Sequence, residues 1–143
     1  MGTVKLGTDD IRYIAIFENM TGAVVKDCLV EEGNRVVFVV KQGDIGLAIG
    51  RGGATIQRVK TLIGRDIEVV EHAPDPSLFI KNVLKPAEVK RVHITTRKDG
   101  KRIALVDVDE KHRGLAIGKG GRNIQRAKIL AKRHHEIEDV IIV

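Results

Sequence analysis

The sequence has few of the residues on which several kinds of functional site depend. Cys28 is the only cysteine, so the chain can form neither an internal disulfide nor a multi-cysteine metal site. Trp is missing, and the aromatic residues are limited to Tyr13, Phe17, Phe38 and Phe79. Surfaces that stack single-stranded bases on aromatic rings need more of them. The sequence therefore disfavours such a platform, and we expect Cys28 to be a small buried residue in a reduced compartment.

Long hydrophobic runs are missing as well. No segment approaches the roughly 20 apolar residues that cross a bilayer, and the N-terminus lacks the pattern of a signal peptide. We therefore expect a cytoplasmic protein with no membrane partner. The 143 residues, 43% of them hydrophobic, suffice for one ordinary domain or for two small ones of about 70 residues.

An internal repeat organises the chain. Residues 46–62 read GLAIGRGGATIQRVKTL and residues 114–130 read GLAIGKGGRNIQRAKIL, with identity at 12 of 17 positions and an offset of 68. The offset is about half the chain, and Pro74 and Pro76 between the two copies are typical of a linker. We predict two domains, residues 1–72 and residues 73–143.

Hydrophobic periodicity predicts the same order of elements in both halves. In the first half we expect a helix at 8–21, strands at 24–30 and 35–41, a short helix capped by Asp44, a helix at 53–63 and a strand at 67–70. In the second half we expect a helix at 76–84, strands at 89–96 and 102–108, a helix capped near Asp109, a helix at 121–132 and a strand at 140–143. Each half is thus an αββααβ unit of the α+β class, a three-stranded sheet with helices on one face.

The most informative part of the repeat is a glycine-rich loop between two expected helices. The loop reads Ile49-Gly50-Arg51-Gly52-Gly53 in the first half and Ile117-Gly118-Lys119-Gly120-Gly121 in the second. Glycines allow a sharp turn and the close approach of another chain. The helix that follows offers unpaired N–H groups and a positive dipole end, and the central basic side chain adds charge. Both loops are therefore candidates for binding a phosphate backbone.

Other chemistry is disfavoured by spacing. A nucleotide-binding P-loop needs four residues between its first two glycines and Ser or Thr after the lysine, whereas three residues separate Gly114 from Gly118 and Gly120 follows Lys119. The spacing therefore disfavours the interpretation that the protein is a small NTPase. The adjacent pair His134 and His135 at a helix end would point in different directions, which suits the helix dipole better than a metal. We expect no catalytic residue, metal, cofactor or small-molecule substrate.

The pattern I-G-x-x-G before an apolar helix resembles the KH domain, whose GxxG loop clamps about four nucleotides by their backbone. The αββααβ order resembles its type II form, and two such units in tandem resemble the KH pair of NusA-like transcription factors, in particular the short archaeal ones. The resemblance implies a non-catalytic protein that binds single-stranded RNA and acts in transcription termination or antitermination on nascent RNA, with RNA polymerase as a further partner. A structural component of a ribonucleoprotein such as the ribosome is the alternative.

The expected RNA-binding residues lie in the two loops and on the helices that follow them. Residues 46–65 and 114–133 together hold ten basic and no acidic residues, whereas the rest of the chain has a net charge of −4. By resemblance, isoleucines beside each loop form an aliphatic groove for bases, although these side chains are equally candidates for the core. Besides the loops, the candidates are Ile56, Arg58, Arg122, Ile124 and Arg126. The second half has the larger net charge, +7 against −1, so we expect it to contribute more of the salt-dependent affinity.

Overall fold

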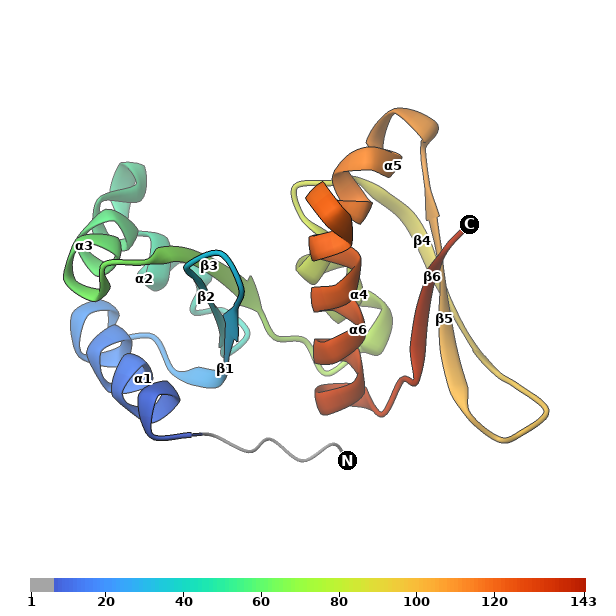
Figure 1. Cartoon of the computed structure of the whole chain (residues 1–143), viewed down its shortest axis with the longest axis horizontal. Helices are drawn as coiled ribbons and strands as arrows, with labels where there is room; N and C mark the ends of the chain where they lie inside the picture. Colours follow the sequence, from blue (N-terminus) through green and yellow to red (C-terminus); the bar gives the residue numbers. More distant parts are fainter. Residues whose placement is uncertain (1–6) are drawn as a thin grey trace. The chain divides into compact units, whose positions relative to one another are not determined.

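Each half of the chain forms a three-stranded sheet with helices packed on one face, as shown by the computed structural model, which describes residues 7–143 (Figure 1). The described residues divide into two units, one that ends at His72 and one that runs from Ala73 to Val143. The predicted α+β class and the αββααβ order are confirmed. Within residues 7–143, no helix is long and apolar enough to span a membrane.

The elements of the two units correspond one to one. The first unit contains α1 (Thr8–Thr21), β1 (Val25–Glu31), β2 (Arg35–Val40), α2 (Ile45–Ile49), the 3-10 turn η1 (Arg51–Gly53), α3 (Ala54–Ile63) and β3 (Asp66–Glu71). The second unit contains α4 (Pro76–Leu84), β4 (Val89–Thr96), β5 (Arg102–Val108), α5 (Glu110–Ile117), the 3-10 turn η2 (Lys119–Gly121), α6 (Arg122–His135) and β6 (Asp139–Ile142).

The two sheets share one topology. The central strand, β2 or β5, is antiparallel to the strand before it and parallel to the strand after it. A bulge interrupts each antiparallel pair at the same place, between Val25 and Asp27 in one unit and between Val89 and Arg91 in the other. Because a parallel pair needs a crossover connection, each glycine loop lies inside that crossover, between two helices.

Aromatic packing joins helix and sheet in the first unit. The ring of Phe17 on α1 stacks on that of Phe38 on β2, with 4.2 Å between the centroids, and both side chains are fully buried. Cys28 is buried in the same cluster, as expected. Stacked rings of this kind contribute about 1 kcal/mol beyond the burial of their area, so the contact holds α1 against the sheet.

The ends of the helices show where the two copies diverge. The helix α3 ends at Ile63 and is capped by Gly64, whose left-handed φ of 75° is a common way to end a helix. Lys132 stands at the equivalent position of the second copy, and α6 continues to His135. The sequence prediction, which ended this helix at residue 132, was therefore three residues short.

The side-chain caps predicted at two helix starts were wrong. Asp44 precedes α2, but its carboxylate accepts a hydrogen bond from the backbone N–H of Val24, 2.8 Å away. Asp109 precedes α5, but its carboxylate lies 2.8 Å from Nζ of Lys90. Asp44 therefore ties α2 to the residue before β1, and Asp109 ties α5 to β4, instead of capping these helices.

His135 gives the second unit a pH dependence. Its Nε2 lies 2.9 Å from the backbone oxygen of Ala73, and burial holds the pKa of His135 below its usual value of 6.5. Below pH 6.5 the unfolded chain binds a proton that the folded unit resists, so the free energy of unfolding should fall as the pH decreases. Urea denaturation of wild type and His135→Gln at pH 7.5 and 5.5 checks this. The stability difference between the two should shrink at pH 5.5, and an unchanged difference would contradict the assignment.

Candidate nucleic-acid interface

The two glycine loops adopt the same backbone conformation. The first glycine has φ and ψ of 75° and 173° at Gly50 and of 78° and 168° at Gly118. The second glycine has φ and ψ of 60° and 19° at Gly52 and of 64° and 20° at Gly120. All four φ values lie in the positive region that favours glycine. The loop is therefore a defined structure built twice.

The glycines of each loop serve two different purposes. A Cβ atom on Gly50 would collide with Oγ1 of Thr55 and lie 2.9 Å from its backbone nitrogen, and one on Gly118 would lie 2.7 Å from Cγ of Asn123. A Cβ atom on Gly52 or Gly120 would meet nothing within 4 Å. The first glycine thus lets the loop close on its own helix, whereas the later one leaves bare backbone facing open space.

The helices that leave the loops begin without a side-chain cap. Gly53 and Gly121 occupy the cap positions of α3 and α6, and neither first turn contains an acidic residue. The first N–H groups of a helix have no partner within it. At both loops the cap residue and the first helical residue already donate to loop carbonyls, as Gly53 does to Gly50 and Ala54 does to Arg51. The helix start therefore offers an incoming anion mainly the partial positive charge of the dipole.

The central basic side chain of each loop is available to a ligand. Arg51 and Lys119 are exposed, and neither side chain forms an ion pair or hydrogen bond with any residue in the described range 7–143. Arg58 on α3 is exposed as well, and Arg122 at the start of α6 is half-buried. These four cations can reach a phosphate without first losing a protein partner.

Arg126 does not fit the RNA-binding role that the sequence predicts for it. It occupies the same position of the repeat as Arg58, yet only 4% of it is exposed, and it has a partner within the protein. The α6 helix packs against α4 in this unit. The side chain is therefore part of the packing of the second unit and does not face a ligand.

The isoleucines also separate into two groups. Ile56 is 9% exposed and belongs to the core cluster of the first unit with Phe17 and Phe38, so it cannot form a groove wall as predicted. Ile49 is 36% exposed, and Ile117 and Ile124 are half-buried. These three keep accessible apolar surface beside the loops.

Sequence reasoning missed one pair of exposed leucines. Leu47 on α2 and Leu115 on α5 occupy the same position of the repeat and are 52% and 44% exposed. Both lie in the short helix that enters a loop, three residues before its first glycine. The sequence signal was the repetition alone, because leucine stands at the same position in both copies. Only the structure shows that both side chains are exposed.

A hydrogen bond braces the loop of the second unit. Nδ2 of Asn123 donates to the backbone oxygen of Leu115, 2.9 Å away, and so joins the start of α6 to α5 across the loop. The first unit has Thr55 at this position, where Oγ1 fills the space beside Gly50 instead. The same loop conformation is thus supported in two ways.

Part of the charge counted from the sequence does not lie at the loops. Arg65 follows α3, at the end opposite to the glycine loop, and its guanidinium lies 5.8 Å from the ring centre of Tyr13. In the second unit, Nζ of Lys128 lies 3.5 Å from a carboxylate oxygen of Asp139, and Lys132 pairs with Glu138 in the same way. The excess of positive charge at the loops is therefore smaller than the segment count indicates.

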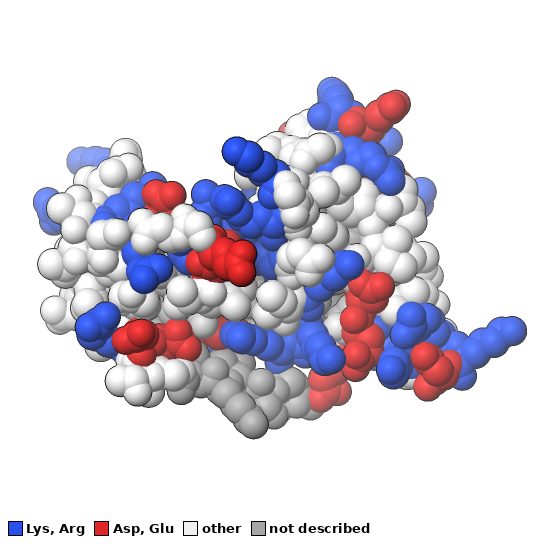
Figure 2. Space-filling view, viewed as in Figure 1, with Lys and Arg blue, Asp and Glu red and all other residues white. Residues whose placement is uncertain are grey.

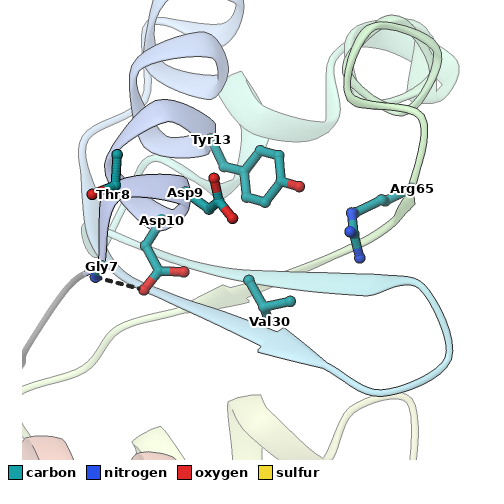
Figure 3. Close-up of a pocket in the computed structure, with 7 residues that line it drawn as sticks. All are labelled: Gly7, Thr8, Asp9, Asp10, Tyr13, Val30 and Arg65. Carbon is teal, nitrogen blue, oxygen red and sulfur yellow. Dashed lines mark hydrogen bonds between the residues drawn. The ribbon is translucent and has the colours of Figure 1, made fainter.

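Arg65 borders a separate hollow on the first unit. This pocket of about 390 Å³ is lined by Asp9, Asp10 and Tyr13 of α1, by Val30 of β1 and by Arg65 (Figure 3). The carboxylate of Asp10 already accepts a hydrogen bond from the N–H of Gly7. Two acids at its rim make the pocket unsuited to phosphate, so it is not part of the anion site.

The histidine pair at the end of α6 has a packing role. The rings of His134 and His135 both lie 5.3 Å from that of Phe79, measured between centroids. In the part of the chain that the structure describes, no three His, Cys, Asp or Glu side chains are grouped closely enough to hold a metal ion.

Comparisons with known proteins agree with this architecture. The model of the NusA-like second KH domain matches residues 76–142, and a KH domain model matches residues 11–86. A protein of Halobacterium salinarum named "Probable transcription termination protein NusA" is 38% identical over 138 residues, covering 96% of this chain and 97% of that protein. A protein of the same name from Methanococcus vannielii is 38% identical over 141 residues, 98% of this chain and 80% of its own length. The crystal structure of APE1850 is 34% identical, with a TM-score of 0.82, and covers 96% of this chain and 100% of its own.

Proposed function

Because the chain belongs to the family of archaeal NusA-like proteins with two tandem KH domains, we propose that it is an RNA-binding transcription factor that acts on nascent RNA. The observation that carries the proposal is the duplicated loop, with the same backbone conformation, an exposed cation and an uncapped helix start in both units. KH domains use such a loop to hold single-stranded nucleic acid. The family binds RNA and is not a class of enzymes.

The phosphate backbone of RNA is the part that the loops would hold. The open backbone at Gly52 and Gly120 would allow a phosphate to approach closely, where the positive end of the helix dipole favours its charge. Arg51 and Lys119 add a charge to each site, and Arg58 and Arg122 extend the positive surface along the helices. At about four nucleotides for each loop, the two units together accommodate about eight.

Bases would be sorted by apolar contacts beside the loops. Ile49, Ile117 and Ile124 keep accessible side chains there, and Leu47 and Leu115 add exposed apolar surface on the helices that enter the loops. Aliphatic contacts of this kind suit a protein with one tyrosine, three phenylalanines and no tryptophan. Arg126 and Ile56 are not part of the proposed site.

The proposal extends to the organisation and setting of the protein. Residues 1–72 and 73–143 would be separate folding domains, each with its own RNA site. The protein would act in the cytoplasm, without a cofactor or a small-molecule substrate, and would alter transcription termination in contact with RNA polymerase. Relatives named as transcription termination proteins support this setting over a place in the ribosome.

Fractionation of cell extracts tests whether the protein acts with RNA polymerase or with the ribosome. We expect the protein, recovered after crosslinking, to co-purify with elongating RNA polymerase and with newly made RNA, because its proposed ligand is the nascent chain. Ribonuclease treatment before purification separates direct contact with the polymerase from tethering by RNA. Recovery in stoichiometric amounts with ribosomal subunits, and not with polymerase, would refute the proposed role.

A further inference from the structure

The hairpin formed by β4 and β5 carries positive charge that the glycine loops do not account for. Residues 89–108, which we call the basic hairpin, contain six basic and two acidic residues, a net charge of +4. The corresponding residues 25–40 of the first unit contain two basic and three acidic residues, a net charge of −1. Since the two hairpins share strand order and bulge position, the fold does not require this charge.

The charge is concentrated where the hairpin leaves the sheet. The strand β6 pairs with residues 103–106 of β5 only, so the turn extends beyond it (Figure 1). Figure 2 shows Lys and Arg side chains gathered over this turn, at the lower right. Lys98 and Lys101 are exposed and form no ion pair with any of residues 7–143. The turn itself is well defined, because Arg97 and Lys101 are joined by a backbone hydrogen bond of 2.8 Å.

Lys90 pairs at 2.8 Å with Asp109, just outside the hairpin, but two other cations that have acidic partners are held only weakly. Arg91 pairs with Asp107 at 3.4 Å, Arg97 pairs with Asp99 at 3.4 Å, and all four side chains are at least one-third exposed. Exposed ion pairs contribute little to stability and are screened by salt. A polyanion can therefore take over these cations at small cost.

The surface of the basic hairpin suits a chain of phosphates better than a protein. None of the exposed large hydrophobic side chains lies within residues 89–108, and the hairpin contains no Phe, Tyr or Trp. Protein interfaces depend on apolar and aromatic anchors at their centre. Phosphate contacts need only cations and a regular backbone.

We propose that the basic hairpin is a second RNA contact, which binds the phosphate backbone of RNA beyond the segment held by the glycine loops. The inference rests on the proposed function, because it takes RNA as the polyanion. The contact is independent of sequence, since it involves phosphates and not bases. Because only a longer RNA reaches the hairpin as well as the glycine loops, the affinity of the protein for RNA depends on the length of the RNA.

The test compares two RNA lengths and two pairs of lysines. Binding of labelled random-sequence RNA of 8 and 24 nucleotides is measured for wild type, Lys98→Glu/Lys101→Glu and the control Lys26→Glu/Lys41→Glu, which makes the same charge change at exposed lysines of the first unit. We expect the hairpin variant to lose about tenfold in affinity for the long RNA and less than about twofold for the short one. With Lys98→Gln/Lys101→Gln, the slope of log affinity against log salt for the long RNA should fall by about 1.4.

The outcomes separate this inference from the proposed function. If wild type binds neither RNA, the proposed function fails. If wild type binds both and the hairpin variant matches the control, or loses both lengths equally, the hairpin contact alone is refuted. If the hairpin variant keeps RNA affinity but no longer co-purifies with RNA polymerase, the hairpin binds an acidic protein surface and the inference is overturned. Circular dichroism confirms that each variant is folded.

Discussion

Replacing Arg51 and Lys119 together by aspartate is expected to lower the affinity for single-stranded RNA by about a hundredfold at 0.1 M salt. The reason is that each glycine loop then has a carboxylate next to the open backbone at Gly52 or Gly120, where the proposed function places a phosphate. Fluorescence anisotropy with RNA of about eight nucleotides, twice the length that one KH loop clamps, measures the loss.

The control for this variant is Lys26→Asp/Lys41→Asp, which changes the net charge equally on exposed side chains outside the loops. It should lower the affinity only a few-fold, because the lost positive charge weakens the long-range attraction between RNA and the protein as a whole. Between the single variants, Lys119→Asp should cost more than Arg51→Asp, because the second unit carries the larger positive charge. Equal losses for the double variant and its control would refute the assignment of the loops.

The second large effect concerns the stability of the first unit. Gly50→Ala should lower the free energy of unfolding of this unit by about 3 kcal/mol or more, since its φ and ψ belong to a region that only glycine occupies easily and its Cβ would collide with Thr55. Tyr13 is the only tyrosine, no tryptophan is present, and its side chain is buried in this unit. Urea denaturation followed by tyrosine fluorescence therefore reports on the first unit alone.

Gly52→Ala is the matched comparison for this substitution. Its φ is also positive, but an added Cβ would meet nothing within 4 Å, so we expect a cost of only about 1 kcal/mol, the usual penalty for a left-handed residue. A Gly50→Ala variant as stable as Gly52→Ala would show that the loop relaxes and that the first glycine is not needed for closure.

Much of the fold could be predicted because the sequence repeats itself and its periodicity is regular. The helix Pro76–Leu84 and the strands Val89–Thr96 and Arg102–Val108 have the bounds that the residue pattern indicates. The loop was recognisable for the same reason, since glycines and one cation recur at equal spacing in both copies. Local patterns are enough where local forces decide the conformation.

The remaining features depend on neighbours that are distant in the sequence. Arg58 and Arg126 stand in the same I-Q-R context, yet one is exposed and the other is buried in a unit where α6 packs on α4. Asp44 lies at a helix start, but its carboxylate accepts a hydrogen bond from the N–H of Val24, twenty residues away in the sequence. The basic hairpin lies outside the repeated segments, and its charge stands out only in comparison with the equivalent strand pair of the first unit.

The different ends of α3 and α6 show that the packing at one end of these helices can change without changing the glycine loop at the other end. Where Gly64 ends one helix, Lys132 lets the other continue, which lengthens it by about one turn, or roughly 6 Å. The added turn brings the histidine pair onto Phe79. The glycine loops at the opposite ends of these helices nevertheless keep the same backbone angles to within a few degrees. A duplicated domain of this kind can therefore adjust its stability at one end of a helix while the binding geometry at the other end stays the same.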